Sequence, residues 1–319
     1  MTHSGAQPEQ RRALLLVNRR ARRGAQWADL AHQQLSAAGY SLITPHEDDE
    51  RSYSELILAH QHQVDVVIVG GGDGTLNAAA PGLMQSRLPL GILPLGTAND
   101  FARTLGIPFN VDAAINIIVT GHTRRIDLGE VNGHLFLNVS SVGFSASLAR
   151  NLTAAAKKKW GTAGYALAAL RLLRQSRPFS AMLHYDGQQE AIKTVQFSVG
   201  NGRFYGGGMT IEKDAAPDDG RLDAYSLEVR HWWQILALFP SLRRGTHGRW
   251  GSVRTLSGTQ FSLHTRRPHD INADGEIIGR TPAHYRLIGG AIAVLAPNKT
   301  LTAYCYGTLI SADESVPLF

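Results

Sequence analysis

The stretch VVIVGGGDGTLNAAAPGL, from Val66 to Leu83, joins a strand pattern, a glycine-rich turn and a helix pattern. The apolar run predicts a buried strand, and the glycines let backbone N–H groups approach a phosphate at the N-terminus of the next helix. Asp73 lies inside this turn, where its negative charge would repel a phosphate. A divalent cation between acid and phosphate would remove that repulsion, so the stretch raises the hypothesis of a nucleotide bound together with a metal ion.

This turn differs from two common phosphate-binding motifs. A Walker A sequence needs Gly-Lys-Ser/Thr, whereas Gly74 is followed by Thr75 and Leu76. A dinucleotide-binding G-x-G-x-x-G read from Gly72 meets Asn77 where the third glycine should stand. A glycine cluster is also common in a plain strand-to-helix turn, so the acid and the threonine carry the functional interpretation.

The first third of the chain alternates short apolar runs with helical patterns. Strands are predicted at 13–18, 41–44, 64–70 and 88–96, and helices at 26–40, at 52–62, from Thr75 and from about Asn99. This order predicts a parallel sheet with helices on both faces and a ligand site at the carboxyl ends of the strands.

A second loop, PLGTANDFARTLGIP, begins at Pro94 and follows the neighbouring strand. Thr97 offers a hydroxyl there, and Asn99 or Asp100 is placed to cap the following helix. We expect the two loops to converge on one crevice.

From about Asp127 the sequence changes to short β-rich runs separated by turn signals, which predict an antiparallel sandwich or barrel. Helical patterns interrupt these runs at 154–174 and 232–243. HEDDE (His46 to Glu50) lies between the strand at 41–44 and the helix at 52–62, and its acids favour the N-terminus of that helix over a metal cluster.

Composition limits the class of protein. The chain has 319 residues, 43% of them hydrophobic, which suits two folded domains. Its single cysteine, Cys305, excludes an internal disulfide framework and is typical of a cytoplasmic protein. The net charge of +6 suits an anionic lipid surface, a nucleotide or a nucleic acid, and of these we expect no nucleic-acid partner.

GGGDGTLN together with LGILPLGTANDFARTLGIP resembles the catalytic domain of the diacylglycerol kinase family, which includes the bacterial YegS-type lipid kinases. Matches continue through IDLGEVNGHLFLNVSSVGF, DDGRLDAYSL and NADGE, so the resemblance extends from Ala13 to about Pro297. It implies a Rossmann-like nucleotide-binding domain at 11–127 and a β-sandwich lipid-substrate domain at 128–297, with the active site in the cleft between them. A tail at 298–319 could return to the first domain.

The resemblance implies ATP-dependent phosphorylation of a lipid hydroxyl, on diacylglycerol, phosphatidylglycerol or a similar acceptor. Asp274 of NADGE falls on the catalytic acid of the family, and Asp219 falls on a side-chain ligand of Mg²⁺, or of Ca²⁺ at a structural site. The other ligands would be the main-chain carbonyls of Ala216 and Arg221. The positions that fall on the nucleotide contacts are Thr44, Gly72, Asp73, Gly74, Thr75, Leu76, Asn77, Ala78 and Thr97.

Several alternatives stay open. Ala78 stands where relatives often carry Glu, which removes any polar role there. Taken alone, Asn-Ala-Asp-Gly is an ordinary hairpin turn and PDDGRLD an ordinary loop. GGDGT is also shared with NAD kinases, so nucleotide phosphorylation is a second hypothesis, and a catalytically inactive nucleotide- or membrane-binding protein is a third.

An acceptor in the bilayer requires membrane contact, so we expect a cytoplasmic protein that associates reversibly with an anionic membrane surface. In the helical pattern at 154–174, Lys157 to Lys159 and Trp160 precede an apolar face that includes Leu167, Leu170 and Leu173. The segment RHWWQILALFPSLRRGTHGRW repeats the mixture of aromatic, apolar and basic residues. Both segments are typical either of interfacial helices or of ordinary amphipathic helices with solvated charges.

Overall fold

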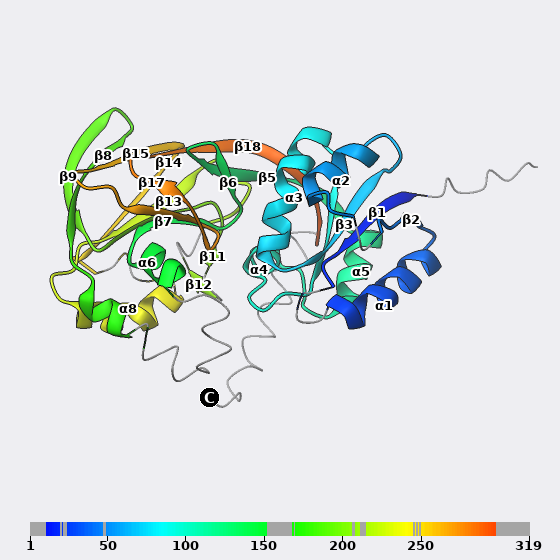
Figure 1. The fold of residues 1–319 in the computed structure, drawn as a ribbon, viewed down its shortest axis with the longest axis horizontal. Coiled ribbons are helices and arrows are strands. Elements are labelled where there is room, and N and C mark those ends of the chain that lie inside the picture. Colours follow the sequence, from blue (N-terminus) through cyan, green and yellow to red (C-terminus); the bar gives the residue numbers. More distant parts are fainter. Residues whose placement is uncertain are drawn as a thin grey trace, which may run out of the picture. The chain divides into compact units, whose positions relative to one another are not determined.

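The computed structural model describes residues 11–19, 21, 24–46, 49–151, 168, 170–205, 208–210, 215–244, 246, 248 and 250–297 (Figure 1). The chain divides into two compact units, Met1–Arg125 with Ile292–Phe319, and Ile126–Ala291. The first unit is a parallel α/β domain and the second is built from antiparallel strands, which confirms the predicted fold class. The predicted tail at 298–319 lies outside the described residues.

The sheet of the first unit is parallel. Its order is β2 (Ser41–Ile43), β1 (Arg12–Val17), β3 (Val66–Gly71), β4 (Leu90–Pro94) and the end of β18 (Ala283–Ala296). Every residue of β3 and β4 is buried, as expected for strands covered on both faces. Val294 pairs in parallel with Leu90, so the end of β18 belongs to the first unit, whereas the sequence placed it in the second domain.

Helices cover both faces of this sheet. They are α1 (Gly24–Ala37), α2 (Tyr53–His60), α3 (Asp73–Ser86), α4 (Asp100–Thr104) and α5 (Val111–Thr120). α2 packs against α3 on one face, and α1 packs against α5 on the other (Figure 1). The predicted alternation of strands and helices is therefore confirmed.

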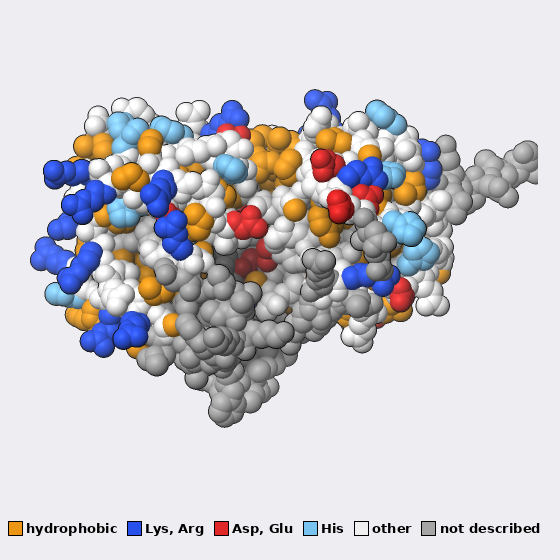
Figure 2. Space-filling view, in the orientation of Figure 1, with side chains coloured by type: hydrophobic (Ala, Val, Ile, Leu, Met, Phe, Trp, Pro, Cys, Tyr) orange, Lys and Arg blue, Asp and Glu red, His pale blue; other side chains and the backbone are white. Residues whose placement is uncertain are grey.

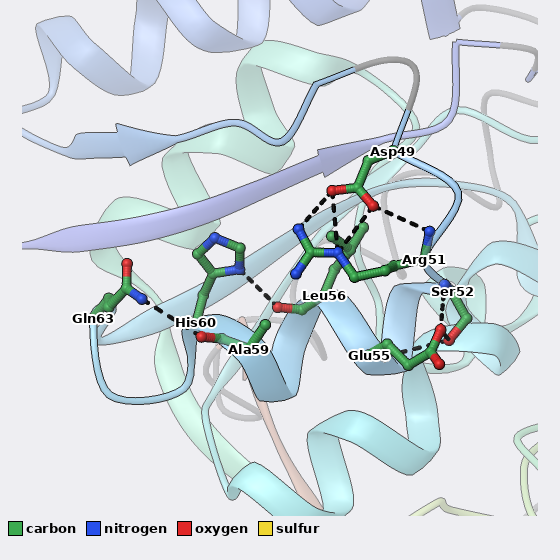
Figure 3. A network of polar contacts seen from close by, with 8 residues as sticks. All are labelled: Asp49, Arg51, Ser52, Glu55, Leu56, Ala59, His60 and Gln63. Atoms are coloured by element: carbon green, nitrogen blue, oxygen red, sulfur yellow. Dashed lines mark hydrogen bonds and ion pairs between the residues drawn. The ribbon is translucent and has the colours of Figure 1, made fainter.

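The N-terminus of α2 is held by local hydrogen bonds (Figure 3). The Ser52 hydroxyl accepts from the backbone N–H of Glu55 at 3.3 Å, and the Glu55 carboxylate accepts from the backbone N–H of Ser52 at 2.8 Å. This reciprocal pair is a capping box, which satisfies two otherwise unpaired helix donors. Asp49 orders the preceding turn, because its carboxylate lies 2.6 Å from a guanidinium nitrogen of Arg51.

α2 and α3 approach closely at Gly82. A Cβ on Gly82 would lie 2.7 Å from the Cα of Ser54, so only glycine permits this approach. Pro81 lacks an N–H and opens the hydrogen-bond ladder of α3. The Ser54 hydroxyl enters the opening, where it accepts from the Gly82 N–H at 3.1 Å and donates to the Ala78 carbonyl at 2.7 Å. This contact fixes the helix that begins in the glycine-rich turn.

Two antiparallel sheets form the second unit. β18 continues there beside β15 (Gln260–Thr265), β8 (Phe179–Tyr185) and β9 (Gln188–Thr194), and also pairs with β5 (His122–Val131), which pairs with β6 (His134–Phe136). The other sheet has the order β14 (Val253–Gly258), β13 (Leu222–Leu227), β10 (Gln196–Gly200), β7 (Val139–Gly143), β16 (Asp270–Ala273) and β17 (Glu276–Arg280). β11 (Phe204–Tyr205) pairs with β12 (Met209–Thr210). Phe136, Phe197 and Phe261 pack in the core that both sheets share, so the predicted sandwich is confirmed.

The second unit also contains two helices, α6 (Phe144–Asn151) and α8 (Trp232–Arg244). A second apolar cluster forms where α8 packs on the sheet. Ile235 and Leu238 of α8 pack with Leu173 against Tyr225 and Leu227 of β13. α8 confirms the helix predicted at 232–243. The helix predicted at 154–174 falls mostly outside the described residues, and 170–175 is helical within them.

Candidate functional site

The two predicted loops meet at the carboxyl edge of the parallel sheet in the first unit. Gly71 ends β3, and its carbonyl accepts a hydrogen bond from the N–H of Leu95, just after β4, at 2.9 Å. A Cβ on Gly96 would lie 2.5 Å from the Cα of Gly72, so the two backbones touch where both residues lack side chains. The expected convergence of the loops is confirmed, and it depends on glycine at both positions.

Asp73, the acid in the glycine-rich turn, accepts two backbone hydrogen bonds from the next loop. One carboxylate oxygen accepts from the backbone N–H of Phe101 at 2.9 Å, and the other accepts from that of Asp100 at 3.1 Å. Asp73 therefore caps the N-terminus of α4 from a distant part of the chain. Negative charge is favourable at a helix N-terminus, so this contact needs no metal ion.

Asn99 has a different role from the predicted helix cap. It occupies the position before α4 in a left-handed conformation, with φ of 50°, but its side chain makes no capping hydrogen bond. Its Oδ1 instead accepts from the Gly96 N–H at 2.9 Å, and its amide donates to the Gly96 carbonyl at 3.2 Å. Asn99 thus shapes the second loop and leaves the helix donors to Asp73.

The remaining nucleotide-loop positions fall into an exposed and a buried group. Gly74, Ala78 and Thr97 are exposed, and a Cβ on Gly74 would meet no neighbouring atom within 4 Å. Thr75 and Leu76 are buried, and the Thr75 hydroxyl accepts from the Asn18 amide at 3.1 Å. Asn18 is not among the predicted site residues, and its only signal in the sequence is its position at the carboxyl end of β1.

Two further predicted positions remain. Thr44 is exposed directly after β2, on the same edge of the sheet. Asn77 lies in the first turn of α3, and its buried Oδ1 has no hydrogen-bond partner in the described structure. Thr44, Gly74 and Thr97 therefore share one edge of the sheet, where the structure leaves their surfaces open.

In the second unit, Asp274 lies in the hairpin turn between β16 and β17. Asp274 and Gly275 have φ of 45° and 97°, which matches the turn that Asp-Gly favours. The Asp274 carboxylate accepts from the backbone N–H groups of Leu137 at 2.6 Å, Asn138 at 3.1 Å and Val139 at 3.0 Å. These donors hold the carboxylate at the start of β7.

Asp127 joins two other segments of the same unit. Its side chain is buried and accepts from the N–H of Gly290 at 2.6 Å and from that of Gly220 at 2.9 Å. Asn201 donates to the carbonyls of Asp127 at 2.7 Å and Leu137 at 3.3 Å. Asn201 is not among the predicted site residues, because nothing local to its Gly-Asn-Gly stretch indicates partners this far along the chain.

The predicted cation loop is closed by its own hydrogen bonds. The Asp219 carboxylate accepts from the N–H groups of Ala216 and Arg221, both at 3.2 Å. The Arg221 guanidinium lies 3.3 Å from Asp219 and 3.4 Å from Asp223, so it balances both carboxylates. Among the described residues, no group of three or more His, Cys, Asp or Glu side chains is placed to hold a metal ion. A carboxylate with loop carbonyls is nevertheless the kind of oxygen donor set that Mg²⁺ and Ca²⁺ accept.

The chain is similar to known proteins over most of its length. The profile described as "Diacylglycerol kinase catalytic domain" matches residues 12–131, and the profile described as "YegS C-terminal NAD kinase beta sandwich-like domain" matches residues 138–296. The chain belongs to the diacylglycerol kinase family. In this diacylglycerol kinase family member, the first match contains both glycine loops and Asp127, and the second contains Asp219 and Asp274.

Individual relatives agree with the family match. A diacylglycerol kinase of Staphylococcus aureus (strain bovine RF122 / ET3-1) is 28% identical over 258 residues, covering 80% of this chain and 81% of the relative. The diacylglycerol kinase of strain JH9 is 28% identical over 242 residues, covering 75% and 77%. A crystal structure of a diacylglycerol kinase from Bacillus anthracis str. Sterne has a TM-score of 0.73 and 26% identity, covering 93% of this chain and 100% of that one. Membership in this family supports a lipid kinase activity in general terms.

None of the described helices has the length and apolar character needed to cross a bilayer.

Proposed function

We propose that this protein is an ATP-dependent lipid kinase that transfers the γ-phosphate to the hydroxyl of a membrane lipid of the diacylglycerol type. Membership in the diacylglycerol kinase family and the names of its relatives support the reaction class. The observation that carries the proposal is the contact between the two loops, in which Gly72 and Gly96 meet directly beside exposed Gly74 and Thr97.

The nucleotide phosphates would bind where α3 begins. Backbone N–H groups in the first turn of a helix attract phosphate, and Gly74 lets a ligand approach them without a side chain in the way. The Thr97 hydroxyl adds a donor from the second loop, and Thr44 adds one from the end of β2. Asp73 orients the site, since it keeps the second loop and α4 in register with the first.

Asp274 would act on the acceptor hydroxyl. Its three backbone donors fix the direction of the carboxylate, and a carboxylate is a group that can take the proton of an acceptor hydroxyl. Such a carboxylate is a weak base, which suits phosphoryl transfer, because the transition state is loose and demands little basicity from the enzyme.

A divalent cation would have two uses here. Mg²⁺ bound with the nucleotide would neutralise charge that develops on the transferred group. A second cation would be held by Asp219 with the carbonyls of Ala216 and Arg221. Because the Arg221 guanidinium already balances Asp219, we assign that second cation to stabilising the loop and to no step of the reaction.

The test is a transfer assay with purified protein, radiolabelled ATP and Mg²⁺, in which dioctanoylglycerol, phosphatidylglycerol and NAD are compared as acceptors. We expect label in the lipid and none in NAD. The variant Asp274→Asn is the control for transfer that depends on the site. Label in NAD alone would support the nucleotide kinase alternative, and ATP hydrolysis without transfer to any acceptor would contradict the proposal.

A further inference from the structure

The outer face of α8 is apolar. Trp233 is 55% exposed and Leu236 is 48% exposed, and both lie on the face that also carries exposed Ala237 and Pro240. Positions i, i+3, i+4 and i+7 share one side of a helix, so these four residues form a continuous stripe, which we call the α8 stripe. The opposite side buries Ile235 and Leu238 in the apolar cluster described above. α8 is therefore apolar on both sides, which is unusual for a helix that faces water.

Arginine side chains lie beside α8. Arg174 lies over the ring of Trp232 at 5.6 Å from its centroid, and exposed Arg171 shares a hollow with it. Exposed Arg177 and Arg230 add two more charges, and the segments 168–178 and 229–241 contain no acid. Lys and Arg side chains gather over the end of the second unit that carries α8, β8 and β9 (Figure 2).

Charge differs sharply between the two units. Residues 126–291 contain 20 Lys and Arg against 13 Asp and Glu, whereas the rest of the chain contains 12 against 13. The whole positive excess of the protein therefore lies in the unit that carries the α8 stripe, and this excess attracts an anionic partner over a distance of about a Debye length, ~10 Å at moderate salt.

We propose that the α8 stripe and the arginines beside it dock the protein on an anionic bilayer surface. Trp233 and Leu236 would enter the boundary between headgroups and acyl chains, and Arg171, Arg174 and Arg230 would meet lipid phosphates. Tryptophan and arginine suit this interface because each has an apolar body and a polar end. The inference rests on the proposed function, since a kinase whose acceptor stays in the bilayer must reach it.

A second copy of the chain is a poorer occupant. A symmetric dimer through the α8 stripe would place the same patch on itself, so that Arg171, Arg174 and Arg230 of the two copies faced one another. No acid in the two segments could pair with them. An anionic lipid surface is complementary to the stripe in both charge and polarity.

The experiment measures sedimentation of the full chain with vesicles of phosphatidylcholine, with and without phosphatidylglycerol, at low and at physiological ionic strength. We expect binding only with phosphatidylglycerol. The double variant Trp233→Gln with Leu236→Gln should bind about tenfold more weakly or worse, and Arg171→Gln with Arg174→Gln should lose binding most at high salt. Arg12→Gln with Arg87→Gln, exposed arginines of the first unit, is the matched control and should bind like the parent.

Two further measurements separate the outcomes. Thermal unfolding shows that each variant is folded, and turnover of soluble dioctanoylglycerol should be unchanged by the α8 variants while turnover in vesicles falls. Equal vesicle binding by parent and α8 variants would overturn the proposal, as would a parent dimer that the same variants dissociate. If no acceptor is phosphorylated at all, the proposed function fails. The sedimentation result still shows whether the protein binds vesicles through the α8 stripe.

Discussion

The carboxylate of Asp73 lies on the N-terminus of α4, 2.9 Å from the backbone nitrogen of Phe101. Asp73 is the first residue of α3, so this one side chain joins the starts of two helices that follow neighbouring strands. The geometry of both glycine-containing loops thus depends on hydrogen bonds between residues far apart in the sequence.

Replacing Asp73 by Ala should lower both stability and turnover. The loss of a helix cap costs about 1 kcal/mol of the free energy of unfolding, and two backbone donors of α4 lose their partner. Turnover should fall at least as severely as ATP affinity, because both loops shift. Chemical denaturation, ATP titration and initial rates measure the three effects. The control is Asp29→Ala, which removes an exposed acid of α1. An Asp73→Ala variant as stable as the parent would show that this cap does not stabilise the fold.

Replacing Asp274 by Asn should abolish transfer and destabilise the second unit. Asn tolerates the left-handed backbone at this position, so the turn should form. An NH2 group replaces one carboxylate oxygen and cannot accept from the backbone donor that it faces. The unpaired donor costs about 1–3 kcal/mol of the free energy of unfolding. Calorimetry and the transfer assay test this, with Glu276→Gln, exposed at the start of β17, as control. Near-normal turnover would place the base elsewhere.

Mg²⁺ should raise the melting temperature, and Asp219→Ala should remove that rise. A cation at 100 times its dissociation constant adds about 2.7 kcal/mol to the free energy of unfolding. Without Asp219, the Arg221 guanidinium keeps Asp223 as its ion-pair partner among the described residues. Melting curves in EDTA and in excess Mg²⁺ measure the difference. An equal rise in the parent and in Asp219→Ala would locate the stabilising cation at another site.

Replacing Gly82 by Ala should destabilise the first unit although alanine favours helix. The new Cβ would meet the backbone of Ser54 at 2.7 Å, and overpacking of this kind costs about 1–3 kcal/mol. Ser54→Ala should cost about 1 kcal/mol through the lost hydroxyl bridge. Gln85→Ala, exposed on the same helix, serves as control and should leave the midpoint of urea unfolding unchanged.

The pKa of Asp49 should be about 2, below its ordinary value of 3.8, because the Arg51 side chain and backbone N–H donate to it. The folded state favours the ionised form, so any stabilisation by this pair is present above about pH 4 and is lost as the pH falls through 2. The pair is exposed, so its effect on stability should be small. Carboxyl NMR titration measures the pKa, which Arg51→Gln should return to its ordinary range.

The sequence by itself determined the order of strands and helices and the location of the turns. Backbone preferences are set by near neighbours, which is why the run before Gly70, the glycine turn at Gly72 and the Asp-Gly hairpin at Asp274 could be predicted from short patterns. α8 was predicted from its apolar spacing for the same reason.

Only the tertiary structure decided what the polar and apolar side chains meet. The Asp73 carboxylate accepts from backbone N–H groups of α4, a contact that the sequence did not predict, and the metal ion expected beside it stays a prediction. Asp274 accepts from Leu137 to Val139, 135 to 137 residues earlier in the chain. Partners this distant depend on how strands from different parts of the chain align, and no local pattern encodes that alignment. α8 is apolar on both sides, so its spacing could not show which side faces water, and only packing against β13 left Trp233 and Leu236 exposed.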